Sequence, residues 1–345
     1  MPMSKNQIPM KKPASCSLSE ILGPAITRQE AESLIQKDTE AFRIFSGFPR
    51  ENREKLTEFI QGMRGLKITY DSFFKHVMNP DTHPSRLESF LSALLEQKTI
   101  IRQVLPLEGV RMSESGSFVI MDIAAELSDG TIVNVEIQKI GYLFPGERAS
   151  CYISDFIMRQ YNRVKDERRE HFSFRDLKPV ILIVIMENSS APFKAVSPEY
   201  IHREKTLFDS GARVNSLSSV IYISLDTFHE TVQNIDTELK AWLTFLSTDE
   251  PADIVRLVRA YPKFRSCYQD IVEFRKKPEE LIYMYSEALA ILDKNTEIYM
   301  CEELKKENAV LLKEVENLRA EKEAVLLQKD AEIASLRRQL NSHLK

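Results

Sequence analysis

Two acidic residues lie in neighbouring apolar segments on either side of a turn. Asp122 lies within the apolar run 119–125, and Glu136 lies within 132–140, two positions before Gln138. Ionised carboxylates are costly to bury among such residues unless they are paired or bound to a cation. Two carboxylates and a backbone carbonyl make a hard oxygen site suited to Mg²⁺, which keeps water molecules for use as nucleophiles. Beside a phosphodiester, such a site would stabilise the phosphate charge and lower the pKa of the attacking water.

Convergence of the two carboxylates depends on the Ser-Asp-Gly-Thr turn between the segments. A two-residue loop would pair Asp122 with Ile137 and direct the two carboxylates to opposite faces of the hairpin. A three-residue loop at 128–130, with Gly130 in a left-handed conformation, would instead pair Asp122 with Glu136. Glycine at 130 suits the second arrangement, in which the backbone carbonyl of Ile137 lies beside both acids.

Hydrophobic patterning predicts the elements that must position this hairpin. The continuous apolar, β-branched run 180–186 is typical of a buried central strand. Further strands are expected at about 100–105, 118–127, 132–140 and 219–225, and helices at 27–45, 50–63, 70–79, 85–96 and 147–165. Capping boxes at 27–30 and 85–88 begin two of these helices. The order helix, strand, hairpin, helix, strand predicts an α/β fold with a mixed sheet.

Composition and charge exclude several classes of protein. The chain has 345 residues, of which 43% are hydrophobic and 28% charged, as is ordinary for a folded globular protein. Its net charge of −4 means that any nucleic-acid contact must use local patches. The four cysteines lack metal-binding spacing, which argues against a zinc module and favours a reducing cytoplasm. The longest strongly apolar run, 180–186, is too short to span a membrane, and no secretory signal is visible.

The segment from about 297 onward is rich in Glu, Lys and Leu with heptad spacing. The positions spaced alternately by four and three residues are Leu304, Asn308, Leu311, Val315, Leu318, Lys322 and Val325. A second set, one residue out of phase, is Leu326, Ile333 and Leu340, which predicts a discontinuity near 325. We expect a coiled coil that forms a homodimer, with Asn308 setting the register. A single solvated helix is the alternative.

The acidic hairpin and its flanking segments resemble a known family. The segments concerned are Asp122, Gly130, Glu136-Ile137-Gln138, Asp71-Ser72-Phe73-Phe74-Lys75 and Glu147-Arg148-Ala149-Ser150-Cys151-Tyr152. Together they resemble the PD-(D/E)XK nuclease family transposases, also called recombination-promoting nucleases, of the restriction-endonuclease-like superfamily. The resemblance covers roughly 50–300. It implies a divalent metal, Mg²⁺ or alternatively Mn²⁺, held by Asp122, Glu136 and the carbonyl of Ile137, and DNA as the substrate.

The resemblance implies the fold of the core, and composition and periodicity divide the rest of the chain. The fold is a restriction-endonuclease-like αβββαβ core with a mixed sheet, extra N-terminal and C-terminal helices, and a C-terminal coiled coil. The expected parts are a disordered tail at 1–20, an N-terminal helical extension at 21–65, the nuclease core at 66–230, a helical region at 231–296 and the coiled coil at 297–345.

One position departs from the superfamily pattern. The lysine of Glu-x-Lys, which orients the attacking water and stabilises developing negative charge, is replaced by Gln138, a residue usual at this position in the family. The resemblance implies that the Gln138 amide orients the water, although it supplies no charge. Alternation along a strand puts Lys139 on the face opposite Glu136, so Lys139 could compensate only if the strand bulges.

Four residues are candidates for DNA or phosphate contact under the resemblance. They are Arg148, Tyr152 and Gln160 on the helix that follows the hairpin, and Lys75 on the helix at 70–79. Arg148 and Tyr152 belong to a polar stripe that continues to Asp155 and Arg159, and the alternative is a solvated face with an Arg–Asp pair. Asp71 is interpreted as an N-cap, and Glu88 as a capping-box residue rather than a further metal ligand.

Two functions of different classes follow. The first is a Mg²⁺-dependent DNA endonuclease in a bacterial cytoplasm, associated with the nucleoid, that acts in mobile-DNA transfer or recombination. Its catalytic residues would be Asp122, Glu136 and Gln138. The alternative is a catalytically degenerate nuclease fold that acts as a DNA-binding or coiled-coil interaction module.

Overall fold

The computed structural model describes residues 16–343 except 107–121, 142–143, 145 and 213. The chain forms two compact units, Met1–Ala290 and Ile291–Lys345. Within the described ranges, no helix has both the length and the apolar character needed to cross a membrane.

A mixed sheet forms the centre of the first unit. Its strands are β1 (Ile101–Val104), β2 (Ile123–Leu127), β3 (Ile132–Ile140), β4 (Val180–Asn188), β5 (Ile201–Arg203) and β6 (Ser218–Ser224), in the spatial order β1-β2-β3-β4-β6-β5. Strands β2 and β3 are antiparallel, whereas β3, β4 and β6 run parallel. The predicted mixed α/β class is therefore confirmed, and the apolar run 180–186 lies in an interior strand. Strand β5 was not predicted because it has only three residues, all at least partly exposed.

Helices cover both faces of this sheet. The α-helices that the structure describes are α1 (Leu18–Leu22), α2 (Arg28–Ile35), α3 (Thr39–Gly47), α4 (Arg50–Gln61), α5 (Asp71–Val77), α6 (Pro84–Leu95), α7 (Gly146–Arg168), α8 (Ala191–Lys194), α9 (Leu225–Thr231), α10 (Glu238–Ser247), α11 (Pro251–Ala260), α12 (Phe264–Lys276) and α13 (Pro278–His343). Along the chain, α6, β1 to β3, α7 and β4 follow one another as helix, three strands, helix and strand.

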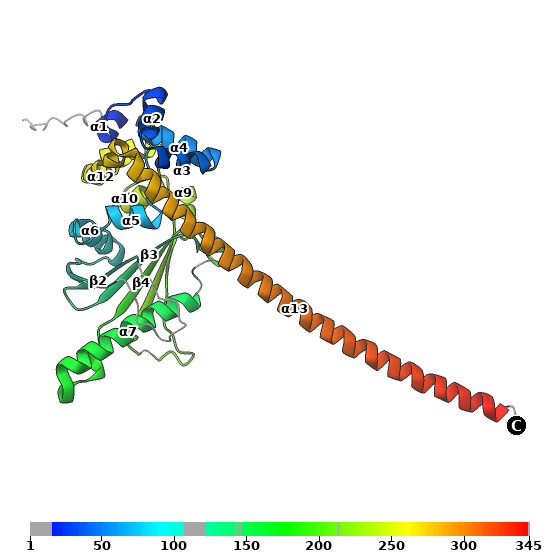
Figure 1. Ribbon diagram of the computed structural model, residues 1–345. Coiled ribbons are helices and arrows are strands. Elements are labelled where there is room, and N and C mark those ends of the chain that lie inside the picture. Colours follow the sequence, from blue (N-terminus) through cyan, green and yellow to red (C-terminus); the bar gives the residue numbers. More distant parts are fainter. Residues whose placement is uncertain (1–15, 107–121, 142–143, 145, 213, 344–345) are drawn as a thin grey trace, which may run out of the picture. The chain divides into compact units, whose positions relative to one another are not determined.

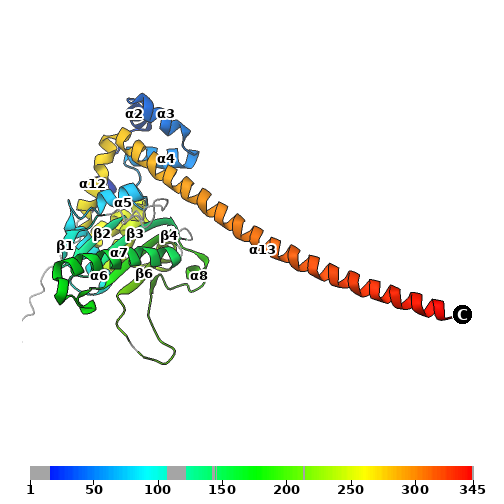
Figure 2. The same ribbon diagram turned by 60° about the horizontal axis from the view of Figure 1, so that its bottom comes forward.

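The two faces have different cores. One face packs on α7, with Ala124 and Leu182 from the sheet against Ile153 and Phe156 from the helix. The opposite face packs on a larger cluster from the other helices, including α5, α6 and α10 (Figure 1). Turning the molecule brings α7 in front of the strands (Figure 2). Alternate residues of β3 therefore point either under α7 or into the larger core.

Local sequence signals predict some helix starts and miss others. Thr27 and Glu30 form the predicted capping box, because each accepts the backbone N–H of the other. The box predicted at 85–88 is wrong, since α6 begins at Pro84 with His83 as its N-cap. The predicted tail at 1–20 lies mostly outside the described residues, and its last part already belongs to α1.

The turn between β2 and β3 is the three-residue alternative. Gly130 has a φ of +89°, and its N–H donates to Leu127 O at 2.9 Å. The Leu127 N–H donates to Thr131 O at 2.8 Å, which closes the loop 128–130. The ladder pairs Ile123 with Val135. One further step along this register puts Asp122 opposite Glu136.

The turn glycine is the basis of a stability prediction. A Cβ at Gly130 would lie 2.9 Å from Lys178 Cγ on a backbone that β-branched residues rarely adopt. We expect Gly130→Val to lower the free energy of unfolding by about 1–3 kcal/mol. Urea denaturation measures this change, with Ser128→Ala at an exposed position of the same loop as the control. Equal unfolding midpoints for the two variants would contradict this account of the turn.

In the second unit, α13 continues through the predicted discontinuity near 325 without a break. The described heptad side chains are exposed on the single chain, with Leu311 at 51% and Leu318 at 59%. The coiled coil stays a prediction.

Candidate metal centre

Asp122 and Glu136 meet on the sheet face that α7 covers. Both are buried, at 8% and 1% exposure. The Asp122 backbone N–H donates to Glu136 Oε1 at 3.1 Å, and the Ile137 N–H donates to Asp122 Oδ2 at 2.7 Å. Each carboxylate thus accepts a backbone N–H from the neighbouring segment. The structure brings together the two acids that the sequence singles out, with the Ile137 peptide beside them.

Burial makes the charged forms of this pair unfavourable. It raises the pKa of Asp122 well above its ordinary value, and the negative charge of Glu136 raises it further. Burial also raises the pKa of Glu136 to about 7, although the Asp122 N–H and the Asn134 amide oppose this shift. Two neighbouring carboxylates whose pKa values are both raised are suited to exchanging protons for a cation.

Helix α5 contributes a lysine and a third acid to this centre. Lys75 Nζ lies 3.3 Å from Asp122 Oδ1 and 2.8 Å from Asp71 Oδ1. Asp71 is the first residue of α5, and Tyr70 is the N-cap, so the N-cap interpretation of Asp71 is wrong. Asp71 also raises the pKa of Asp122 through its charge. The missed signal is the i, i+4 spacing of Asp71 and Lys75, which puts both on one helix face.

Helix α7 brings Arg148 and Tyr152 to the same centre. Arg148 Nη2 donates to the Tyr152 hydroxyl at 2.8 Å, and its guanidinium lies 4.7 Å from the Phe144 ring centroid. The charge of Arg148 lowers the pKa of Glu136. Burial, followed by the charge of Glu136, raises the pKa of Tyr152 to about 12. Tyr152 and Asp155 of the polar stripe are buried, so the solvated part of the alternative is wrong. Its Arg–Asp pair is confirmed, because Arg159 Nη2 lies 2.5 Å from Asp155 Oδ2.

The predicted water-orienting residue and its neighbour lie on opposite faces. Strand β3 pairs with β4 in one register through Gln138 and Ile140, so the strand does not bulge there. Gln138 therefore shares the face of Glu136 and is partly exposed. Lys139 lies on the other face, where its Nζ is 2.9 Å from Glu187 Oε2. It cannot replace the missing lysine.

Two further polar residues under α7 have structural partners. Gln160 accepts the Lys178 N–H at 2.5 Å and donates to the Lys178 carbonyl at 3.2 Å, just before β4 begins. A phosphate contact by Gln160 would require these bonds to break. Asn134, which sequence reasoning missed, is fully buried and donates to Glu136 Oε1 at 3.0 Å. The sequence could have indicated Asn134, because it lies two residues before Glu136 and therefore on the same face of the strand.

Glu88 does not belong to this centre. Its Oε1 accepts the Ile101 N–H at 2.9 Å at the start of β1.

The donor atoms fit a hard divalent cation. Within the described ranges, no three or more His, Cys, Asp or Glu side chains form a group that could hold a metal. Two carboxylates and a carbonyl are nevertheless the donor types that Mg²⁺ takes, and Mg²⁺ keeps several waters rather than a full protein cage. Asp122, Glu136 and the Ile137 carbonyl stay the candidate ligands.

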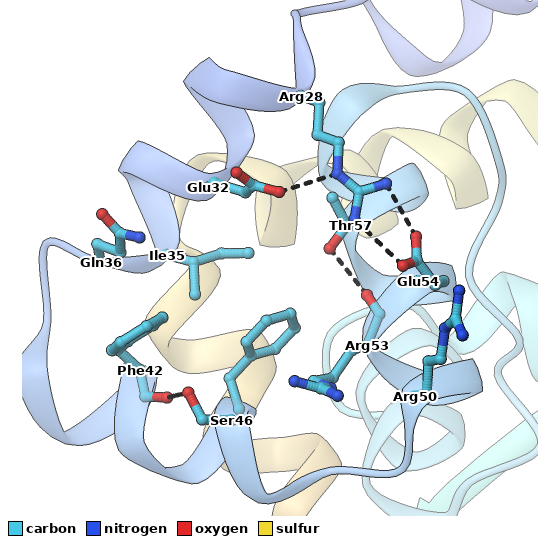
Figure 3. Close-up of a pocket in the computed structure, with 11 residues that line it drawn as sticks. Arg28, Glu32, Ile35, Gln36, Phe42, Ser46, Arg50, Arg53, Glu54 and Thr57 are labelled. Carbon is cyan, nitrogen blue, oxygen red and sulfur yellow. Dashed lines mark hydrogen bonds and ion pairs between the residues drawn. The ribbon is translucent and has the colours of Figure 1, made fainter.

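A separate hollow of about 300 Å³ lies among α2, α3 and α4 (Figure 3). Its apolar lining includes Ile35 and Phe42, and at one side Arg28 binds Glu32 at 2.8 Å and Glu54 at 3.0 Å. None of the predicted site residues lines it. It is distinct from the candidate metal centre.

The raised pKa of Glu136 predicts a pH dependence of stability without metal. Folded Glu136 keeps its proton up to about pH 7, whereas an unfolded glutamate loses it near 4.5. The resulting stabilisation is complete below pH 4.5 and is lost as the pH rises through 7. In EDTA we expect the melting temperature of the wild type to fall more steeply from pH 5 to 8 than that of Glu136→Gln. Parallel melting profiles for the two proteins would count against the buried, proton-binding pair.

Comparison with known proteins gives one result. A family described as PD-(D/E)XK nuclease family transposase matches residues 68–300. No curated protein and no solved structure matches the chain.

Proposed function

The chain belongs to the PD-(D/E)XK nuclease family transposases, and we propose that it is a Mg²⁺-dependent DNA endonuclease acting on mobile DNA or in recombination. The observation that carries this proposal is the convergence of the Asp122 and Glu136 carboxylates on one buried sheet face. The matched range includes both acids, α5 and α7. The proposal includes a restriction-endonuclease-like core and a cytoplasmic, nucleoid-associated location.

In the proposed hydrolysis of a phosphodiester, the side chains of the centre have different roles. Asp122, Glu136 and the Ile137 carbonyl would hold the divalent ion, which when bound lowers the pKa of water and stabilises charge on phosphate. Gln138, partly exposed on the same face, would orient the attacking water through its amide. The Asn134 amide fixes the Glu136 carboxylate by a hydrogen bond.

Positively charged and polar groups beside the acids would hold the DNA. Arg148 and Tyr152 lie next to Glu136, and Arg148 is the cation on α7 whose charge acts on it. Lys75 is half-buried on the opposite side of Asp122. We retain these three as proposed phosphate contacts. Gln160 stays a weaker proposal because both of its polar atoms bind the Lys178 backbone.

Removing either acid tests the proposal. We expect Asp122→Asn and Glu136→Gln each to lower Mg²⁺-dependent plasmid nicking by about a hundredfold or more, since each removes a preorganised charge at the reacting centre. Both substitutions nearly preserve side-chain volume. Gel analysis of supercoiled plasmid with Mg²⁺, Mn²⁺ or EDTA measures the effect.

Glu126→Gln is the matched control. Glu126 is a buried acid on the same face of β2, but its carboxylate binds Arg102 at 3.0 Å and Arg163 at 2.9 Å. Its loss should leave nicking nearly intact if the variant is folded. Equal nicking by the wild type and both acid variants would mean that another site, or a contaminant, cuts the DNA.

A second candidate is a nuclease fold that has lost its activity and acts as an interaction module. It is favoured by the neutral Gln138 at the lysine position. Calorimetric titration distinguishes the two functions. Metal binding by the wild type that disappears in Asp122→Asn, together with nicking, supports the nuclease. Tight metal binding without any cleavage supports the module.

We also propose that the chain forms a homodimer through a coiled coil in its C-terminal helix. The described residues at the heptad positions, including Leu311, Val315 and Leu318, are exposed on the single chain. A second copy would bury them at facing positions of a parallel pair. Two active centres would suit an enzyme that cuts both DNA strands.

Charge substitutions at the heptad positions test this dimer. We expect Leu311→Glu combined with Leu318→Glu to convert the full chain to a monomer, because both carboxylates would enter the apolar seam. Size-exclusion chromatography with light scattering gives the mass. Leu312→Glu, at a position 65% exposed and outside the heptad seam, should remain dimeric. A monomeric wild type would contradict the proposal.

A further inference from the structure

The metal centre lacks a positive charge at the usual place on β3. Gln138 is neutral, and Lys139 is directed to the opposite face, bound to Glu187. Another ammonium reaches the acids from a different element. Lys75 Nζ on α5 lies 3.3 Å from Asp122 Oδ1.

The position of Lys75 is fixed by the structure around it. Helix α5 buries Phe73, Phe74 and Val77 against the larger core, so the helix is anchored beside the sheet. Asp71, one turn earlier, holds the ammonium at 2.8 Å. The side chain of Lys75 is 29% exposed, so its head group borders both the buried acids and the surface. A lysine on a solvated helix face would have neither constraint.

The other cation at the centre is already engaged in a different way. Arg148 donates to the Tyr152 hydroxyl and stacks over Phe144. Its charge acts on Glu136 from the α7 side. Lys75 instead contacts Asp122 directly, from the α5 side. The two cations therefore flank the acid pair from different elements.

We infer that Lys75 is a catalytic residue that supplies, from α5, the positive charge that the Glu-x-Lys lysine would supply from β3. This inference rests on the proposed nuclease function. When the acids hold a divalent ion, like-charge repulsion weakens the contact between Lys75 and Asp122. The ammonium is then available to the attacking water and to the phosphate oxygen on which negative charge develops. Asp71 acts as a positioning residue for Lys75.

Loss of the Lys75 ammonium should affect metal binding and DNA cleavage differently. Lys75 Nζ lies 3.3 Å from Asp122 Oδ1, so the ammonium competes with the ion for the same carboxylate. Removing the ammonium should leave metal affinity unchanged or increase it, while cleavage falls. A residue that merely supports the fold would lower both quantities together.

The experiment uses the full chain and four variants, Lys75→Gln, Gln138→Lys, their combination, and Lys67→Gln. Lys67 is the matched control, because it pairs with Glu187 at 3.0 Å on the other sheet face. Mn²⁺ affinity is measured by isothermal titration calorimetry, and nicking of supercoiled plasmid is measured with the same ion. Thermal melting reports whether each variant is folded.

The supporting result has three parts. Lys75→Gln binds Mn²⁺ at least as tightly as the wild type but nicks at least about tenfold more slowly, as expected for a charge acting on the transition state. The double variant recovers at least half of the lost nicking rate, since Gln138→Lys adds an ammonium to the sheet face that carries Glu136. Lys67→Gln stays within about twofold of the wild type in both measurements.

Several results would overturn the inference. Nicking by Lys75→Gln at the wild-type rate, weaker Mn²⁺ binding by that variant, or no recovery in the double variant would each do so. If the wild type neither binds Mn²⁺ nor nicks DNA, the nuclease proposal and this inference both fail. A nicking wild type with an equally active Lys75→Gln removes the inference alone.

If Lys75→Gln does not fold, the Gln138→Lys single variant tests the inference. If Lys75 already supplies the charge, a second ammonium raises the nicking rate less than about twofold. A tenfold or greater gain would show that the wild-type centre lacked the charge, and would overturn the inference.

Discussion

The burial of two neighbouring carboxylates is the constraint on which the rest of the structure depends. Asp122 and Glu136 are nearly inaccessible to solvent and each accepts a backbone N–H from the other segment. Such a pair is unfavourable when both members are ionised without a cation. The protein surrounds it with Lys75 on one side and Arg148 on the other. A buried acid pair of this kind is stabilised by bound protons, by a neighbouring ammonium or by a divalent ion.

A turn, a neighbouring strand and two helices fix the position of this pair. The left-handed Gly130 sets the loop length, and the loop length sets which side chains of β2 and β3 share a face. Strand β4 holds β3 in a single register as far as Ile140, which keeps Gln138 with the acids and Lys139 away from them. Helices α5 and α7 then bring their polar side chains to the pair from anchored positions.

Much of this arrangement is readable from the sequence, because its signals are local. The apolar run 180–186 predicts an interior strand, and a glycine at 130 favours the register that the structure contains. The acids themselves stand out because carboxylates are rare in apolar strands. Lys75, Arg148 and Tyr152 are singled out only through the family resemblance, and the site roles of Asp71 and Asn134 require tertiary information. Asp71 and Lys75 are 47 or more residues from Asp122 in the chain, and no periodicity connects them.

Each prediction that was wrong or missed has an identifiable physical cause. A Ser-x-x-Glu pattern at 85–88 satisfies the capping rule, but Pro84 starts the helix one residue earlier and Glu88 binds the backbone of β1 instead. The stripe on α7 has the charge content of a solvated face, yet Tyr152 and Asp155 are buried and the charge of Arg148 acts on Glu136 of the sheet. Strand β5 has only three residues, which is too short to show an alternating hydrophobic pattern.

Anomalous diffraction from crystals soaked in Mn²⁺ tests the central claim most directly. The account predicts one strong peak within coordination distance of the Asp122 and Glu136 carboxylates and the Ile137 carbonyl, with water completing the shell. The absence of any peak there, with both carboxylates still bonded to the neighbouring backbone N–H groups at saturating Mn²⁺, would contradict it.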